Sequence, residues 1–249
     1  MLSSRKSSDR SRRPRGSPDD EMTQVWHPGP RVARVRASHS YGIVLALIVV
    51  EFVFMSVAPN SPWADSTLVL LQGGTLVMAL FTSGVASADS AISLGLVALA
   101  AASAVGLLIF GGNTLTGVVG MLSGALTVAT ILTVALGVID QGEANVRAVT
   151  GAVCIYVLIG IMFVYLYGVI AVLGSGDFFT QGTDGTRSLR LYFSFVTLGT
   201  LGYGDYTAAG ELGRTLAVVE ALFGQLYLVT VIAVLVSRMR GGKDRSADS

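Results

Sequence analysis

The feature that most constrains this chain is a stretch of 110 residues, between Arg36 and Arg147, that contains no Lys or Arg. Long apolar segments fill this stretch and continue beyond it, and charged residues make up only 13% of the 249-residue chain. About a quarter of the residues in a soluble domain are charged, so most of this chain belongs in a solvent that does not reward charge. The sequence therefore predicts a membrane protein. Membrane-spanning segments would take up most of the 249 residues, so a sizeable separate enzyme domain does not fit and we expect no enzymatic activity.

Six apolar runs have about the length of a membrane-spanning helix, which needs roughly 20 residues. We predict an all-α membrane protein with six transmembrane helices. Basic residues gather in both tails, so the positive-inside rule predicts a multi-pass protein of the cell membrane with both termini in the cytoplasm. Beside a membrane, a basic tail is expected to attract lipid headgroups rather than nucleic acid. The six runs are 41–57, 67–82, 91–110, 115–139, 151–173 and 212–236.

The long connection between the fifth and sixth runs differs from the other connections. It holds six charged residues around a half-apolar stretch, 189–201, which is too short to span a membrane. An apolar piece of this length is typical of a re-entrant segment. Irregular backbone at membrane depth survives only where it is buried in protein or lines a watery cavity. We therefore expect part of this loop to face water inside the membrane.

The loop contains the sequence TLGYGD, from Thr200 to Asp205. Rings of backbone carbonyls can replace the water shell of a K⁺ ion, and they require alternating right- and left-handed backbone. Left-handed geometry costs a non-glycine residue about 1 to 2 kcal/mol, and Gly202 and Gly204 occupy alternate positions. The motif resembles the selectivity-filter signature of potassium channels, usually written TVGYGD. The competing interpretation is a tight external turn, but the motif lies between a short apolar helix and a full span.

The resemblance extends over residues 151–238 and implies an outer helix, a pore helix at about 188–198, a filter and an inner helix. It places Asp205 at the outer mouth and a gating hinge at Gly224, although close helix packing explains that glycine equally well. In this resemblance, K⁺ would bind at the filter carbonyls of Thr200, Leu201, Gly202 and Tyr203, and Gly204 would complete the filter. The residues of the pore helix that support the filter would be Tyr192, Phe193, Val196 and Thr197.

Two positions depart from the pattern of the family. Gly199 stands before the filter threonine, where relatives carry a small hydroxyl or similar residue, so the base of the filter is expected to be looser. Tyr192 and Phe193 replace tryptophans, so a bond from the pore helix to Asp205 would have to use the Tyr192 hydroxyl.

Charge inside the predicted spans is rare. The run 115–139 has none, so it is not expected to sense voltage, because each charge moved gains only about 2.3 kcal/mol per 100 mV. Glu51 and Glu220 are exceptions, at a cost of about 2.5 to 3.5 kcal/mol for a mid-membrane acid. For Glu51 we expect a protonated acid or a polar interhelical bond. For Glu220 we expect a bond to the back of the pore helix that tunes filter stability.

The resulting organisation is a disordered basic tail (1–40), a four-helix transmembrane domain without voltage-sensor arginines (41–139), a linker (140–150), a pore domain (151–238) and a short cytoplasmic tail (239–249). One pore loop supplies one quarter of a ring, so a homotetramer that conducts K⁺ without a cofactor is expected. Three alternatives remain: a non-selective cation channel, a secondary transporter, and a non-conducting partner subunit.

Overall fold

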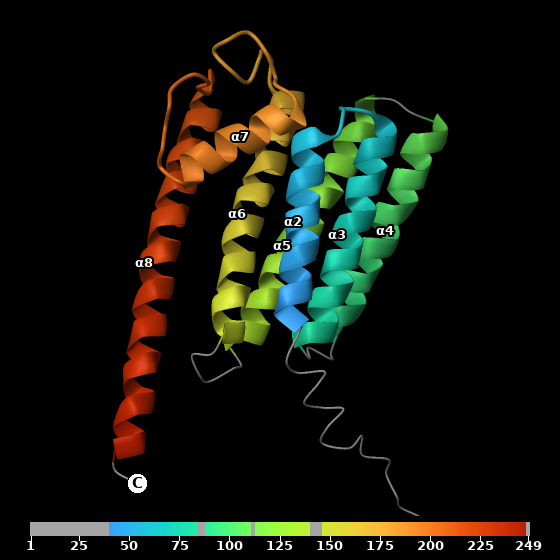
Figure 1. Cartoon of the computed structure of the whole chain (residues 1–249). Coiled ribbons are helices and arrows are strands. Elements are labelled where there is room, and N and C mark those ends of the chain that lie inside the picture. The colour runs from blue at the N-terminus through green and yellow to red at the C-terminus, as the bar shows by residue number, and fades with distance from the viewer. Residues whose placement is uncertain (1–39, 84–87, 111–112, 140–145, 248–249) are drawn as a thin grey trace, which may run out of the picture. The chain divides into compact units, whose positions relative to one another are not determined.

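A computed structural model of the whole chain describes residues 40–83, 88–110, 113–139 and 146–247. Residues 1–39 of the predicted tail and 140–145 of the predicted linker lie outside this part. In the part described, the backbone forms seven α-helices and no β-strand longer than an isolated bridge. The helices are α2 (Ser40–Val57), α3 (Pro62–Ser83), α4 (Ala88–Phe110), α5 (Asn113–Ile139), α6 (Val146–Leu173), α7 (Arg187–Leu198) and α8 (Glu211–Ala247) (Figure 1).

Six of these helices lie at the six predicted apolar runs. Four of them contain segments long and apolar enough to cross a membrane: Pro62–Ser83, Gly117–Ile139, Val146–Leu173 and Glu211–Val234. The apolar parts of α2 and α4 are shorter, Tyr41–Val57 and Leu94–Gly106. The described part of the chain is therefore all-helical with four candidate membrane-spanning helices, and spanning by α2 and α4 stays a prediction.

Two helices extend into segments that were predicted as a linker and a tail. α6 begins at Val146, within the predicted linker, and α8 continues to Ala247, through most of the segment predicted as a tail. All six prolines precede Trp63, so no proline ring interrupts the backbone hydrogen bonds at either place. Helices can extend through such polar flanks once an apolar segment has formed the first turns.

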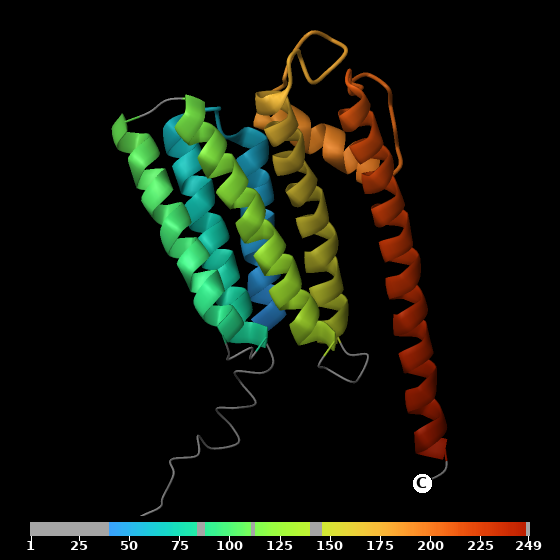
Figure 2. The same ribbon diagram turned by 180° about the vertical axis from the view of Figure 1, so that it is seen from behind.

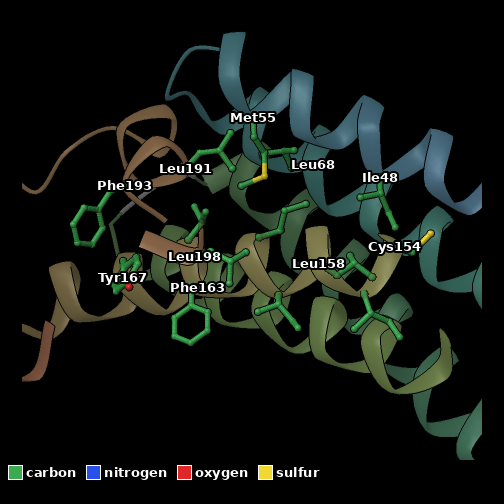
Figure 3. Packing of buried hydrophobic residues seen from close by; sticks show 14 of the residues in the cluster. Ile48, Met55, Leu68, Cys154, Leu158, Phe163, Tyr167, Leu191, Phe193 and Leu198 are labelled. Atoms are coloured by element: carbon green, nitrogen blue, oxygen red, sulfur yellow. The ribbon is translucent and has the colours of Figure 1, made fainter. Parts of the chain in front are cut away.

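One hydrophobic core joins the first helices of the chain to the later ones. α5 packs against α3 and α6, and α2 lies against α3, α6 and α7. Met55 of α2 and Leu191 of α7 belong to the same cluster of buried side chains (Figure 3). A second cluster, which includes Val69 and Leu126, fills the space between α3, α4 and α5. The position of α7 is thus fixed by apolar contacts with both α2 and α6.

α8 has far less cover than the other candidate spans. Only 11% of its apolar window is buried, against 39% to 50% in the other three. Its main contacts are with α6 and α7, and in both views its lower part extends without a neighbour (Figures 1 and 2). Most of the apolar surface of α8 is therefore available to lipid or to other protein.

Candidate functional site

The short helix α7 positions the TLGYGD segment. It begins at Arg187 and is capped by Thr186, whose hydroxyl accepts a hydrogen bond from the Leu189 backbone N–H at 3.1 Å. This cap satisfies one of the free N–H groups of the first turn. α7 ends at Gly199, which has right-handed geometry (φ −77°, ψ −2°) and donates its N–H to the Phe195 carbonyl at 3.0 Å. The segment that follows therefore starts from a fixed helix end.

The residues after Gly199 are tied back to the last turn of α7 through their backbone N–H groups. Thr200 donates to the carbonyl oxygen of Thr197 at 2.9 Å. Leu201 and Gly202 both donate to the carbonyl oxygen of Val196, at 2.8 Å and 3.3 Å. Val196 and Thr197, which were predicted to support this segment, contact it through their carbonyl groups. No hydrogen bond in the described chain uses the carbonyl oxygens of residues 200–204.

The backbone of this segment alternates in hand. Gly202 (φ 53°) and Gly204 (φ 77°) are left-handed, as predicted for the alternate positions. Thr200 is also left-handed (φ 56°), and among the described residues it is the only non-glycine residue with positive φ. This conformation costs a residue with a Cβ about 1 to 2 kcal/mol. The left-handed positions therefore begin at Thr200, two residues before Gly202, and no glycine in the sequence could signal this.

Asp205 is held at the far end of the segment by two side chains. The Tyr192 hydroxyl donates to Asp205 Oδ2 at 2.8 Å, which is the bond expected from the sequence. Gln181, in the loop before α7, donates its side-chain amide to the Asp205 carbonyl oxygen at 2.7 Å. The bond to Asp205 raises the pKa of Tyr192 to about 12, so the hydroxyl is protonated and able to donate at neutral pH. Gln181 was not predicted, because loop side chains give no periodic signal.

Phe193 anchors the opposite side of α7. Its ring is 8% exposed and lies among the rings of Tyr167, Phe178 and Phe179, with centroid separations of 5.2, 6.1 and 5.3 Å. Edge-on aromatic contacts of this kind contribute about 0.5 to 1.5 kcal/mol beyond the area that they bury. The predicted support from Phe193 is thus a contact with α6 and with the loop that follows α6.

Glu220 of α8 is fully buried and joins three helices. Ser194 of α7 lies 2.5 Å from Glu220 Oε1, and the Tyr167 hydroxyl of α6 donates to Glu220 Oε2. The Ser194 hydroxyl also lies 2.8 Å from the Gly160 carbonyl oxygen. The expected bond from Glu220 to the back of α7 is present. The serine at mid-helix was the one local signal for it, whereas Tyr167 gave none.

Glu51 lies in a different polar cluster. It is 1% exposed, and Gln72 of α3 donates to Glu51 Oε1 at 2.9 Å and to the Tyr165 hydroxyl at 2.7 Å. This is the polar interhelical bond expected for Glu51. Gln72 of α3 is the partner of Glu51 in the described chain, and Gln72 is in turn bonded to Thr127 of α5 and Tyr165 of α6. Glu51 is therefore not brought together with the TLGYGD segment.

Gly224 lies where α8 crosses the end of α7. A Cβ at this position would stand 2.4 Å from the Leu198 carbonyl oxygen and 2.9 Å from Leu198 Cδ1. Glycine therefore permits a close approach of the two helices, one of the two roles considered for it. α8 runs through this position as one continuous helix.

Metal ions in proteins are usually held by clusters of side chains. Among the described residues there is no group of three or more His, Cys, Asp and Glu side chains suited to hold a metal ion. Besides the Asp205 carboxylate, the TLGYGD segment offers the backbone carbonyls of residues 200–204, which carry no full charge. Oxygen ligands without full charge suit a weakly held monovalent cation.

Comparisons with known proteins match the part of the chain that contains this site. Residues 152–241 match the family described as Ion channel. The chain is 33% identical over 69 residues to the "Inward rectifier potassium channel Kirbac3.1" of Paramagnetospirillum magnetotacticum, which covers 28% of this chain and 23% of the relative. It is 37% identical over 81 residues to the "Probable potassium channel protein 2" of Methanocaldococcus jannaschii, which covers 31% of this chain and 21% of the relative.

The matched regions are short relative to the whole proteins. The chain spans between a fifth and a quarter of the length of these curated relatives. No solved structure matches the chain significantly. The match to the family includes α7, the TLGYGD segment and most of α8, and it leaves α2 to α5 outside.

Proposed function

We propose, from the premise that residues 152–241 are an ion-channel segment like that of potassium channels, that this chain is a subunit of a potassium-selective channel. One observation carries the proposal: the backbone of residues 200–204 alternates in hand while its first N–H groups are bonded to α7. A left-handed residue at every second position turns successive carbonyls to one side. Their oxygens are then the groups that can replace the water around K⁺.

The selectivity filter in this proposal is the segment Thr200–Gly204, with Asp205 at its outer mouth. Thr200, Leu201, Gly202 and Tyr203 supply the carbonyls that bind K⁺. No charged side chain is needed, because dipoles bind the ion weakly enough to release it. K⁺ passes down its gradient as the permeant ion, and the conduction step requires no cofactor and no chemical reaction.

The exposure of the filter and of α8 supports assembly into a ring. In the single chain Leu201 is 60% exposed and Tyr203 66% exposed, and α8 has little cover. One filter segment supplies one side of a closed pore, so four copies complete it. The proposal is a homotetramer surrounded by membrane lipid, with the apolar face of α8 divided between neighbouring copies, lipid and the water-filled cavity.

The proposed topology places all six long helices across the cell membrane and both termini in the cytoplasm. α7 is then a re-entrant pore helix and α8 the inner helix. α5, which corresponds to the charged helix of voltage sensors, carries no charge, so strong voltage gating is not part of the proposal. Gly224 is the proposed hinge of α8, in addition to its contact with Leu198.

Reversal potentials in a reconstituted bilayer test potassium selectivity. The purified chain is expected to give a reversal potential near the K⁺ equilibrium value when K⁺ and Na⁺ gradients oppose each other. A value near zero would overturn selectivity and favour a non-selective cation channel. The observation that favours that second candidate is Gly199, which places no side chain at the base of the filter.

The same bilayer tests whether the chain conducts without another subunit. We expect K⁺ currents from the purified chain alone. Absence of current from correctly assembled tetramers would show a partner subunit that conducts only beside other chains. Current that saturates and depends on a coupled ion gradient would indicate a transporter instead.

A further inference from the structure

A cavity of about 480 Å³ lies between α3, α5, α6 and the start of α7. Its lining includes Asp65 in the first turn of α3, Gly117 in the second turn of α5 and Val172 at the end of α6. At 1.5 Å of rise per residue, these positions lie within about 6 Å of their helix ends. The lining also reaches Ser123 of α5 and Val164 of α6, roughly 15 Å from the same helix ends. If these helices span a membrane, the cavity therefore opens at the level of lipid headgroups and continues toward the hydrocarbon region.

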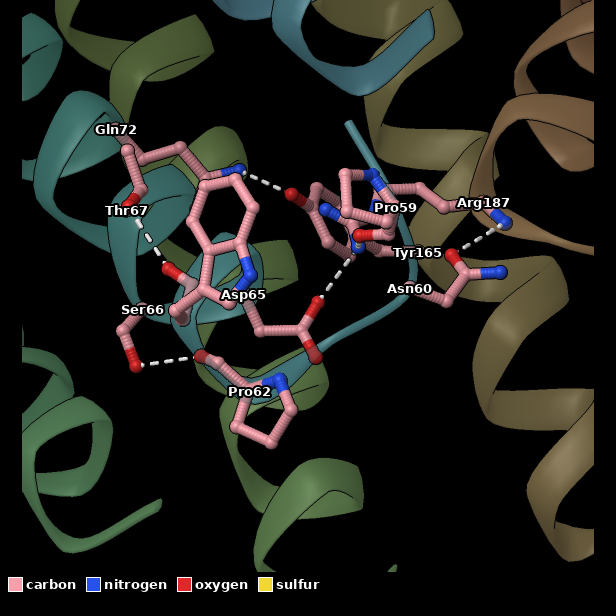
Figure 4. A network of polar contacts seen from close by, with 10 residues as sticks. Pro59, Asn60, Pro62, Asp65, Ser66, Thr67, Gln72, Tyr165 and Arg187 are labelled. Carbon is pink, nitrogen blue, oxygen red and sulfur yellow. Dashed lines mark hydrogen bonds and ion pairs between the residues drawn. The ribbon is translucent and has the colours of Figure 1, made fainter. Parts of the chain in front are cut away.

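The first charged group of this cavity is Arg187, whose side chain is almost fully buried. It forms an ion pair with Asp65 at 2.9 Å, and its backbone N–H donates to Asn60 at 3.3 Å (Figure 4). The same guanidinium lies 3.5 Å from the Pro59 carbonyl oxygen through Nη2. The other terminal nitrogen, Nη1, is buried and has no hydrogen-bond partner in the described chain. Arg187 therefore has N–H groups on Nη1 that are buried away from water without an acceptor in the described chain.

Arg190 is the second charged group of the cavity. Its Nη1 donates to the backbone carbonyl oxygens of Asp184 at 3.1 Å and Gly185 at 2.9 Å. Its Nε is buried without a partner, and among the described residues no carboxylate forms an ion pair with it. Burial, followed by the nearby charge of Arg187, lowers the pKa of Arg190. The charge of Arg190 is therefore the less well compensated of the two.

The surroundings of the two arginines carry charge of both signs. Arg187 and Arg190 lie one turn apart at the beginning of α7, where the helix dipole is positive, and no acidic residue occupies that first turn. Asp65, which is paired with Arg187, and Asp184, whose Oδ1 accepts the Phe178 backbone N–H at 3.0 Å, also line the cavity and offset part of the arginine charge. Arg187 Nη1 and Arg190 Nε still have no acceptor in the described chain, and the oxygens of an anion in the cavity would supply acceptors.

We infer that this cavity binds a phosphate-type anion, held by Arg187 and Arg190 and supplied either by the headgroup of a membrane lipid or by free phosphate. Guanidinium groups form strong charge-assisted hydrogen bonds to phosphate oxygens. The Tyr165 ring and the apolar ends of α5 and α6 form the remaining walls, which suits a headgroup that carries acyl chains. This site lies apart from the filter, and it does not depend on conduction.

Binding to the purified full chain tests the site and separates the two sources of anion. Native mass spectrometry would measure the affinity for phosphatidylglycerol and for phosphatidylcholine, and a thermal shift assay would measure the effect of inorganic phosphate. We expect phosphatidylglycerol to bind about tenfold more tightly than phosphatidylcholine, because both lipids offer a phosphate but the choline cation of phosphatidylcholine adds positive charge beside the two arginines. If inorganic phosphate alone stabilises the protein and displaces phosphatidylglycerol, the source is a free anion.

Variants locate the binding to the cavity. Arg190→Gln removes the charge that lacks an ion pair, and we expect it to weaken phosphatidylglycerol binding about tenfold. Arg190→Lys keeps the charge and should retain most of the affinity. Arg214→Gln is the control, since Arg214 donates to the Ala208 carbonyl oxygen and does not line this cavity. Two outcomes would overturn the proposal: equal affinity for the two lipids together with no effect of phosphate, or unchanged phosphatidylglycerol affinity in Arg190→Gln. The comparison of the two lipids uses the wild-type chain, so it stands even if a variant fails to fold.

Discussion

The first half of the chain (α2 to α5) and the second half (α6 to α8) contain similar residue types but use them differently. Both halves bury one glutamate in apolar surroundings, Glu51 in α2 and Glu220 in α8. Close packing at glycine occurs in both halves, since a Cβ would stand 3.0 Å from a backbone atom of α3 at Gly137 of α5 and 2.4 Å from a backbone oxygen of α7 at Gly224 of α8. Left-handed backbone separates them: every described residue with positive φ, including Gly202, follows α6. The segment of the proposed filter therefore depends on the conformation of individual backbone positions, whereas α2 to α5 depend on helix packing.

The two glutamates show the same difference. Glu220 is bonded to α7 through Ser194, one turn from the end of the helix that carries the filter. Glu51 is bonded to Gln72, whose side-chain oxygen is buried without a partner in the described chain. Glu220 is thus bonded to the helix that carries the proposed filter, whereas Glu51 belongs to a polar cluster between α2 and the neighbouring helices. Substitutions of matched type in the two halves test this comparison.

The largest difference is expected between Gly202→Ala and Gly74→Ala. A Cβ at Gly202 is strained by about 1 to 2 kcal/mol in each subunit, and relief of that strain turns a filter carbonyl away. We expect K⁺ current to disappear in Gly202→Ala. Gly74→Ala should preserve current, since alanine is favoured in a helix by about 1 kcal/mol. Bilayer recordings of both proteins measure the outcome, and K⁺-selective current from Gly202→Ala would contradict the filter assignment.

The next largest effect is expected for Gly224→Ala. The new methyl group would meet the Leu198 carbonyl oxygen at 2.4 Å, so α7 and α8 must separate. Overpacking of this kind typically costs about 1 to 3 kcal/mol. Thermal unfolding should show a lower Tm than in the wild type, while the control Gly95→Ala, with nothing within 4 Å of the Cβ position, should not. An unchanged Tm for Gly224→Ala would argue against the close approach of the two helices.

A smaller effect should separate the two glutamates. Glu220→Leu leaves the Tyr167 hydroxyl without its acceptor, at about 1 to 3 kcal/mol for a buried group left unpaired. It also removes the Ser194 bond between α7 and α8, although Ser194 keeps the Gly160 carbonyl oxygen as an acceptor. We expect a lower Tm and a changed K⁺/Na⁺ permeability ratio. Glu220→Gln can donate to Ser194 and accept from Tyr167, so it should restore both properties.

Glu51→Leu is the matched variant in the other half. It should lower the Tm and leave the permeability ratio as in the wild type, because Glu51 has no bond to α7. Equal changes in permeability for Glu51→Leu and Glu220→Leu would show that the two halves are not separable in this way.

Tyr192→Phe should have a modest effect, because Tyr192 is 38% exposed and its bond to Asp205 competes with water. We expect faster loss of current during sustained conduction. The pKa of Tyr192 is raised to about 12, so the contribution of the bond is fully present below the ordinary value of 10.0 and is lost as pH rises through about 12. The difference between wild type and Tyr192→Phe should therefore be constant from about pH 6 to 9; a difference that vanishes within this range would contradict the assignment.

The smallest effect is expected from membrane voltage. Each charge moved across the membrane contributes about 2.3 kcal/mol per 100 mV, and α5 carries none. Open probability in single-channel records should change little over about 100 mV on either side of zero. A steep dependence would show that charge outside α5 moves during gating.

The sequence predicted those parts of the fold and site that depend on local properties. Apolar runs placed six helices, and the short run 189–201 placed α7. Gly202 and Gly204 predicted the alternation of the filter backbone, because glycine lacks the Cβ that disfavours left-handed geometry. The bond from Tyr192 to Asp205 was expected from the resemblance to potassium channels, in which a tryptophan occupies the place of Tyr192.

Contacts between distant segments were beyond prediction from one sequence. Tyr167 and Glu220 are 53 residues apart, and the ion pair between Asp65 and Arg187 joins the start of α3 to the start of α7. Which faces of two apolar helices meet depends on the packing of many side chains of similar hydrophobicity. The hand of Thr200 was also missed, because the surrounding bonds to α7 impose it.

The sequence by itself determined that this chain is a helical membrane protein with a filter-like segment near its end, because hydrophobicity and glycine conformation act over a few residues. The tertiary structure decided which polar groups meet. It bonded Glu220 to α7 and Glu51 to α3, and it left two arginines beside a cavity with one nitrogen each unpaired in the described chain. These outcomes depend on how whole helices approach one another, since the energy of a buried charge is set by its neighbours in space.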